Sequence, residues 1–338
     1  MKSTVLFHWA IALSFALGLL NGCSSSNQGQ KDLIWPDPPD KPRIKYLRTY
    51  RSEDDFGGNV LNKLTKSLAG ANMKVSLSRP FDVCADGEGQ IFVTDLQSGV
   101  IRIDEMKHEF TPLGEKSRIP LINPRGIACA HGKLFIGLPS LGQIGVFTYD
   151  GEDLYTIGKK REFPNPLDIV VDTIRSRVYV VDNKLHNITV FSEKGDSLFT
   201  IGQRGVDDGT FNFPQAAAVD SAGNLYVADA FNFRIQKFDS TGKFLLKFGK
   251  QGDDWGNFAI MKGIAVDSYG NIYVLDGSHQ HFQVFDPTGT LLLFVGKFST
   301  RNDGFQNPVS ICIDKHNTIY VTDQLNERVQ VFQLLNGM

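Results

Sequence analysis

The sequence predicts an all-β fold, a six-bladed β-propeller whose last blade is closed by an N-terminal strand. Three observations predict it: a motif that recurs every 43–47 residues, four strand-like runs in each copy, and a last copy that lacks its fourth run. The composition agrees, since 33 glycines and 25 phenylalanines in 338 residues are typical of many short strands joined by tight turns.

The recurring motif is clearest at 224–229, where the sequence is Asn-Leu-Tyr-Val-Ala-Asp. Similar segments stand at 90–95, 177–182, 271–276 and 318–323, and a degraded one stands at 133–138. The last residues of these six segments are 43, 44, 47, 47 and 47 positions apart. Six copies with one period indicate a repeat architecture in which each copy forms one blade.

Each copy contains four runs rich in β-branched and aromatic residues, which in the fourth copy are 216–220, 225–229, 234–239 and 244–249. The sixth copy has the first three runs, and the chain then ends at Met338. An orphan run at 43–50 precedes the first copy and matches 243–250. We therefore expect residues 43–50 to complete the last blade, because a blade left one strand short would expose an unpaired edge.

The repeat resembles the NHL repeat, through Gly263-Ile264-Ala265-Val266-Asp267, the segment 223–229 and the segment 232–238. The resemblance covers about residues 43 to 333 and implies a six-bladed propeller. It does not imply one activity, because propellers of this family include scaffolds, RNA-binding proteins and enzymes. A net charge of −2 argues against a nucleic-acid partner, and so does an N-terminal apolar run that predicts export.

The N-terminus predicts export and lipid anchoring. An apolar run at 5–20 is too short to span a bilayer and leads into Leu20-Asn21-Gly22-Cys23, which resembles a bacterial lipobox. The resemblance implies a signal peptide at 1–22, a covalent lipid on Cys23 and a flexible tether at 23–42, followed by a single propeller domain at 43–338. The alternative is an ordinary secretory signal whose cysteine is incidental.

The whole chain resembles the NHL-repeat lipoproteins of Gram-negative bacteria. Ser24 after the cysteine implies sorting to the outer membrane, at its periplasmic face or at the cell surface. The membrane would then be one partner of the protein, reached through the lipid.

A proline recurs before the innermost strands, and the two residues after it are expected at the mouth of the central channel. Four charged residues occupy such positions: Asp82, Arg125, Asp168 and Lys262. They are the candidate ligand-binding residues on the long-loop face. The alternative is that these groups neutralise one another or are solvated in the channel.

The other chemistry-bearing residues favour structural roles. His279 and His281 stand two apart in the fifth blade, with His186 in the third, and they are the weak candidates for a metal site. Cys84, Cys129 and Cys312 fall on innermost strands among small apolar residues, which predicts buried thiols. A short helix is expected at 59–69, and no cofactor is expected.

The leading functional hypothesis is a non-enzymatic, lipid-anchored binding or scaffold module in the cell envelope. An envelope protein or another ligand would dock on the long-loop face. The alternative is a metal-dependent enzyme, a lyase or lactonase-like protein, with its site in the central channel. Only two carboxylates and no histidine stand at the channel-mouth positions, which disfavours the enzyme.

Overall fold

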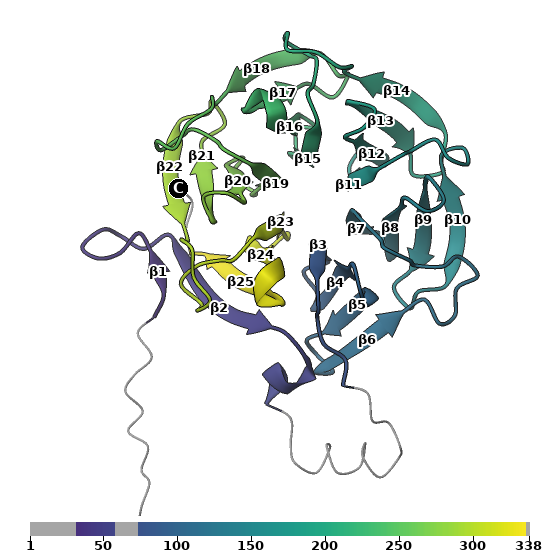
Figure 1. The fold of residues 1–338 in the computed structure, drawn as a ribbon, viewed down its shortest axis with the longest axis horizontal. Coiled ribbons are helices and arrows are strands. Elements are labelled where there is room, and N and C mark those ends of the chain that lie inside the picture. Colours follow the sequence, from purple (N-terminus) through teal and green to yellow (C-terminus); the bar gives the residue numbers. More distant parts are fainter. Residues whose placement is uncertain (1–31, 58–73, 336–338) are drawn as a thin grey trace, which may run out of the picture. The chain divides into compact units, whose positions relative to one another are not determined.

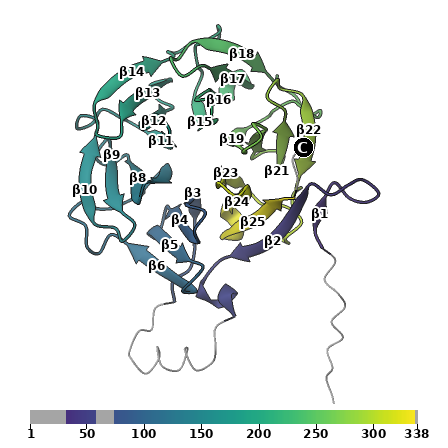
Figure 2. The same ribbon diagram turned by 180° about the vertical axis from the view of Figure 1, so that it is seen from behind.

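The computed structural model shows six blades arranged in a ring around a central channel (Figure 1, and from behind in Figure 2). It describes residues 32–57 and 74–335. The predicted lipobox with Cys23 and the predicted helix at 59–69 lie outside the described residues. Within the described residues, the only helices are short 3-10 turns, and no helix is long and apolar enough to cross a bilayer.

Each blade is an antiparallel sheet whose strands follow one another outward from the channel. Blade 1 consists of β3 (Pro80–Ala85), β4 (Gln90–Asp95), β5 (Gly99–Asp104) and β6 (Glu109–Leu113). Blade 2 consists of β7 (Ile127–Ala130), β8 (Lys133–Leu138), β9 (Gln143–Thr148) and β10 (Asp153–Ile157). Blade 3 consists of β11 (Pro166–Asp172), β12 (Arg177–Asp182), β13 (Asn187–Ser192) and β14 (Ser197–Ile201).

The second half of the chain repeats this order. Blade 4 consists of β15 (Pro214–Val219), β16 (Leu225–Asp229), β17 (Arg234–Phe238) and β18 (Phe244–Phe248). Blade 5 consists of β19 (Met261–Val266), β20 (Ile272–Asp276), β21 (His281–Phe285) and β22 (Leu291–Val295). Blade 6 consists of β23 (Pro308–Ile313), β24 (Thr318–Asp323) and β25 (Arg328–Leu334), followed by β2 (Ile44–Tyr50) and β1 (Ile34–Trp35).

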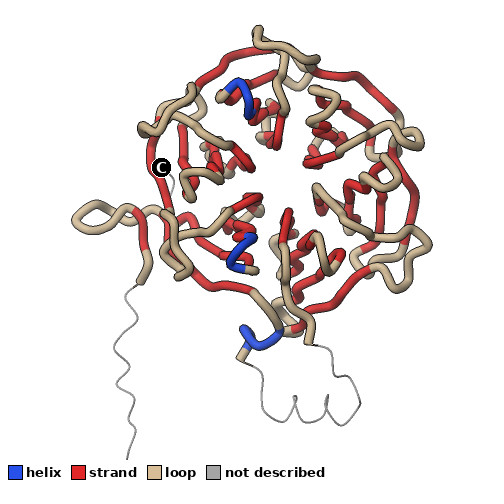
Figure 3. The backbone as a smooth tube through the Cα atoms, viewed as in Figure 1, coloured by secondary structure: helices blue, strands red, loops and turns tan. Residues whose placement is uncertain are grey.

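The two faces of the ring carry different loops. Figure 3 shows the loops (tan) that join the strands (red) around the ring. Innermost strands begin, and second strands end, on the same face; in blade 1, for example, Pro80 pairs with Asp95. We call this face the upper face. It carries the connections between blades and the loops after the second strands, which contact each other through bonds such as Phe231 N–H to the Asn212 carbonyl (3.0 Å). The short hairpins lie on the lower face.

The hydrophobic core lies between adjacent blades. The buried apolar residues among those described form six clusters, and each joins the facing sides of two neighbouring blades. The second strands are central to this packing: all five residues of β16 and of β20 are buried. A strand covered on both faces reads as an apolar run, which explains why the second strand gave the clearest repeat in the sequence.

The ring is closed by the N-terminal segment, which confirms the predicted closure. Strand β2 pairs antiparallel with β25, from Ile44 opposite Leu334 to Tyr50 opposite Val329. Ile44 and Tyr50 are buried against the neighbouring blades. The structure adds a strand that the sequence did not predict: β1 pairs with the outer edge of β2, so the sheet begins at Ile34 rather than at residue 43.

Deleting residues 31–50 should strongly destabilise the propeller, because the deletion exposes the edge of β25 and removes two buried side chains from the core. We expect a loss of several kcal/mol, out of the roughly 5–15 kcal/mol that stabilises a typical domain. Chemical denaturation of the truncated and full-length proteins measures this loss. A chain truncated only before residue 31 is the control, and a melting temperature unchanged by the longer deletion would contradict the closure.

Candidate binding site at the channel mouth

A pocket of about 190 Å³ lies at the upper mouth of the central channel. It is lined chiefly by the residues that follow the recurring proline on the innermost strands of four blades, and by those that follow Met261 at the same position of blade 5. These include three of the four predicted residues, Asp82, Asp168 and Lys262. The lining residues that the sequence analysis did not single out are Phe81, Leu167, Asn183, Gln215, Ala216, Gly263, Ile264, Val309, Ser310 and Ile311.

Asp82 connects three blades. Its Oδ2 accepts a hydrogen bond from the backbone N–H of Ile127 in blade 2 (2.7 Å), and its Oδ1 accepts from the Ser310 hydroxyl of blade 6 (2.5 Å). The backbone N–H of Val83 also donates to Oδ1 (2.8 Å). Burial raises the pKa of Asp82 above its ordinary value, although these donors oppose the rise. Both carboxylate oxygens therefore already have hydrogen-bond donors from the protein.

Asp168 makes the corresponding connection between blades 3 and 4. Its two oxygens accept from the backbone N–H groups of Ile169 and Ala217, both at 2.8 Å. Burial, followed by the negative charge of Asp82, raises the pKa of Asp168. Blade 2 approaches it closely, because a Cβ on Gly126 would lie 2.6 Å from the Asp168 Cα. Glycine is thus required opposite this carboxylate.

The two predicted cations differ in position. Lys262 lines the pocket, and its burial lowers the pKa of its ammonium group. Arg125 is not among the lining residues; its guanidinium lies 4.9 Å from the ring centroid of Phe81. Burial lowers the pKa of Arg125, and its Nε is buried without a hydrogen-bond partner in the described part of the chain. The pocket therefore holds two acids and one base.

The histidines lie away from this pocket. His186 is buried, and its Nδ1 accepts from the backbone N–H of Phe213 (3.1 Å). The rings of His279 and His281 stack at 5.4 Å, and the Nδ1 of His279 lies 3.3 Å from Asp276. Burial and the neighbouring His279 lower the pKa of His281 to about 4, so it is neutral near pH 7. Across residues 32–57 and 74–335, no three His, Cys, Asp or Glu side chains are grouped to hold a metal ion.

The three cysteines meet on the innermost strands of blades 6, 1 and 2. Cys84 is buried, Cys129 and Cys312 are half-buried, and none of the three is in a disulfide. Burial, together with the neighbouring Cys129, raises the pKa of the Cys84 thiol. A protonated, buried thiol is a poor nucleophile, so Cys84 contributes to packing.

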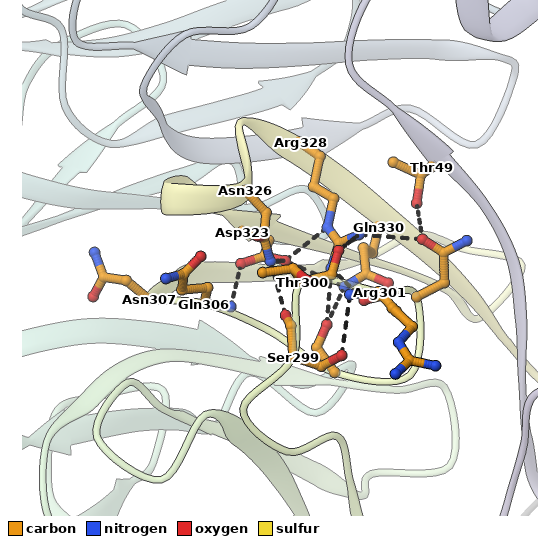
Figure 4. Close-up of polar contacts among 12 residues, drawn as sticks. Thr49, Ser299, Thr300, Arg301, Gln306, Asn307, Asp323, Asn326, Arg328 and Gln330 are labelled. Atoms are coloured by element: carbon orange, nitrogen blue, oxygen red, sulfur yellow. Dashed lines mark hydrogen bonds and ion pairs between the residues drawn. The ribbon is translucent and has the colours of Figure 1, made fainter.

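The Asp–Arg pairs of the repeat are structural. Arg328 is fully buried, and its Nε donates to Asp323 (2.7 Å). Its Nη2 donates to the carbonyls of Arg301 (2.6 Å) and Gly304 (3.0 Å) in the loop that precedes blade 6 (Figure 4). Arg234 bonds Asp229 and its preceding loop in the same way. These arginines fix upper-face loops and have no direct contact with the channel pocket.

Comparison with known proteins supports this architecture. The NHL repeat model matches residues 211–238 and 305–332, which are equivalent parts of blades 4 and 6. The chain is a six-bladed propeller that carries NHL repeats. A sequence comparison with functionally characterised proteins gave no significant match.

Several solved structures share the fold at low sequence identity. A protein of unknown function from Bacteroides thetaiotaomicron has a TM-score of 0.61 at 17% identity, over 76% of this chain and 70% of that one. Virginiamycin B lyase from Staphylococcus aureus has a TM-score of 0.55 at 14% identity, over 76% and 96%. A gluconolactonase from Xanthomonas campestris has a TM-score of 0.59 at 14% identity, over 76% and 86%. At these identities the similarity extends to the fold only.

The raised pKa of Asp168 predicts a distinctive pH dependence of stability. A carboxyl whose pKa is higher in the folded than in the unfolded state destabilises the fold as pH rises through that value. Asp168→Asn removes this effect, so the variant should gain roughly 1–3 kcal/mol relative to wild type between pH 5 and pH 9. Urea denaturation of both proteins at the two pH values measures this gain. Asparagine lacks one of the two oxygen acceptors of aspartate, but this cost is present at both pH values and cancels in the difference. An equal stability difference at both pH values would contradict the raised pKa.

Proposed function

We propose that this protein is a lipid-anchored binding module of the cell envelope, and that a partner protein docks on its upper face. The lipid would be attached to Cys23, as the lipobox resemblance implies. The ring would hold the partner through the upper-face loops, with the channel mouth near the centre of the contact.

The observation that carries the proposal is the exposure of large apolar side chains on the upper-face loops. Val206 is 71% exposed, Leu325 61% and Phe231 57%, and each lies on a connection between blades or on a loop after a second strand. The exposed large apolar residues of these upper-face segments are Ile122, Leu185, Val206, Phe231, Trp255, Ile260, Phe298 and Leu325. Exposed apolar side chains around a polar pocket are typical of protein interaction surfaces. Fewer are exposed on the lower-face hairpins, where they are Met106, Ile174 and Tyr269.

The pocket suits a polar group of the partner. Its volume of about 190 Å³ fits one side chain, and Asp82 and Lys262 offer both signs of charge. Asp168, whose pKa is raised to about 8 by burial and by the charge of Asp82, adds a mostly protonated carboxyl near pH 7. A polar or zwitterionic group can pair with either sign, whereas a bare divalent cation would be repelled by Lys262. The same argument weighs against the metal-dependent lyase or lactonase alternative, because both carboxylates already accept hydrogen bonds from neighbouring blades.

Anchoring is tested by Cys23→Ala. The variant should lack the lipid and leave the membrane fraction, because the apolar contribution of the acyl chains is lost. Fractionation and mass spectrometry of the mature N-terminus measure both effects. A variant that stays in the membrane fraction in the absence of any partner protein would contradict the lipid anchor.

Docking is tested by photo-crosslinking in living cells, with a benzophenone amino acid incorporated at chosen positions of the protein. Probes at Phe231 and Leu325 should crosslink to one common partner, because both lie on the upper face. Probes at Ile174 and Met106, which are more exposed than the test positions and lie on lower-face hairpins, are the controls. Equal crosslinking from both faces, or no crosslinking from the upper face, would contradict the docking proposal.

A further inference from the structure

Blades 4, 5 and 6 each bring three equivalent positions together at the upper outer edge. The first position is the first residue of the third strand, and the second lies in the connection that leads into the blade. The third is the residue of the outer strand that pairs with a repeated glutamine, which is Gln236, Gln283 or Gln330. Each position in one blade is 47 residues from its equivalent in the next, except that the outer strand of blade 6 is supplied by β2. The three blades can therefore be compared position by position.

The set is polar in blades 4 and 6. In blade 4, Lys247 forms an ion pair with Asp208 (2.5 Å), which lies 3.7 Å from Arg234. In blade 6, Asn302 accepts hydrogen bonds from Thr49 (3.5 Å) and Arg328 (3.1 Å). Both arrangements present a hydrophilic edge to solvent.

In blade 5 all three positions are aromatic: His281, Trp255 and Phe294. The rings of Trp255 and Phe294 stack with centroids 3.9 Å apart and planes at 19°, and His281 lies 6.0 Å from Trp255. Trp255 is nevertheless 60% exposed and Phe294 39%. The position of Phe294 is threonine in blades 2, 3 and 6 (Thr156, Thr200 and Thr49). An exposed aromatic pair where other blades carry polar groups is not required for closing a blade.

This aromatic pair borders a groove of about 530 Å³, whose β22 side is apolar and whose other side carries Asp40, Lys41 and Arg43. The groove runs along β22 and is bounded on its other side by the β1–β2 hairpin; its lining residues are Pro36, Asp40, Lys41, Arg43, Trp255, Leu291, Leu292, Leu293 and Phe294. Figure 1 shows β1 outside the ring beside β2 and β22, on the side opposite β10. We call the exposed surface of Trp255, Leu292 and Phe294 the blade 5 rim.

We propose that the blade 5 rim rests on the lipid bilayer in which the protein is anchored. This inference rests on the proposed lipid at Cys23. Leu33 follows Cys23 by ten residues, so the anchoring point lies within about 33–36 Å of Leu33 even for a fully extended chain. The groove starts at Pro36, 13 residues after Cys23 in the sequence, so the tether is long enough for the rim to reach the bilayer.

The chemistry of the rim fits the headgroup level of a bilayer. Tryptophan is enriched at membrane interfaces, and the stems of Lys41 and Arg43 can lie along apolar surface while their charges reach water. Strand β22 is the outermost strand of its sheet, so its unpaired backbone groups need water or headgroup partners. The contact is therefore shallow, with the three side chains of the rim entering the interface.

Tryptophan fluorescence on vesicles tests the contact. The protein without its signal and Cys23 is held by an N-terminal hexahistidine tag on phosphatidylcholine vesicles that contain nickel-chelating and brominated lipids. Trp35→Phe leaves Trp255 as the single tryptophan of residues 24–338. Bromines near the headgroups should quench Trp255 by about half, because interfacial tryptophan lies at that depth. The quenching should persist at about 0.5 M salt, since the contact is apolar. Unquenched Trp255 would overturn the inference.

Two controls distinguish the rim from other surfaces. A single tryptophan at Phe231, in the Trp35→Phe/Trp255→Phe background, should stay unquenched; quenching there instead would place the upper face on the bilayer and overturn the inference. The variant Trp255→Asp/Phe294→Lys carries the ion-paired residues of blade 4. It should fold, with amides of β22 exchanging at the same rate on and off vesicles, whereas the unsubstituted protein should be protected on vesicles.

The design separates this inference from the proposed function. Because the tag replaces the lipid, the quenching experiment gives a result whether or not Cys23 is lipidated in cells. A missing lipid on Cys23 would refute the anchor alone, and missing quenching on tethered protein would refute the rim contact alone.

Discussion

The upper face depends on one buried carboxylate in each of five blades. Asp95, Asp182, Asp229, Asp276 and Asp323 end the second strands and are fully buried. A buried charge is tolerated only with several donors, and Asp276 takes the backbone N–H groups of Ala259 (2.7 Å) and Ser278 (2.9 Å). These donors belong to the loop before the inner strand and to the loop after the second strand. Each aspartate therefore holds together the two loops from which a binding surface is made.

Around this constant interaction the blades vary. Blade 2 has Leu138 where the others have the aspartate, and its inner strand β7 starts only at Ile127, after Gly126 has brought it against Asp168. Blade 5 keeps Asp276 but has His281 in place of the arginine of blades 4 and 6, so its aspartate has backbone donors and the nearby Nδ1 of His279 (3.3 Å) instead of a guanidinium. The packing that closes the ring tolerates such replacements because the core lies between the second strands. The exposed loops and outer strands can therefore carry different residues in different blades without disturbing the closure of the ring.

The sequence predicted the features that follow from the repeat and missed those that depend on contacts between individual side chains. The 47-residue period gave the blades and the closing strand, and the proline register led to the pocket at Asp82, Asp168 and Lys262. It could not show that Arg125 lies over Phe81, because side-chain direction at the start of a strand depends on the neighbouring blade. Strand β1 is two residues long and carries no pattern. The aromatic set of blade 5 did leave a signal, since Asp208, Trp255 and Asn302 share one column of the repeat.

The two proposed surfaces are compatible because they lie at different distances from the channel, although Trp255 belongs to a connection of the upper face. The blade 5 rim belongs to the outer edge, where β22 faces away from the channel, whereas the docking loops surround the channel mouth (Figure 1). A propeller resting on its rim has its channel axis roughly parallel to the membrane plane, so the bilayer does not cover the upper face. A propeller resting on its upper face would bury Phe231 and Leu325 in lipid and close the pocket to any partner. Lateral attachment therefore leaves the channel mouth open to a partner beside the protein.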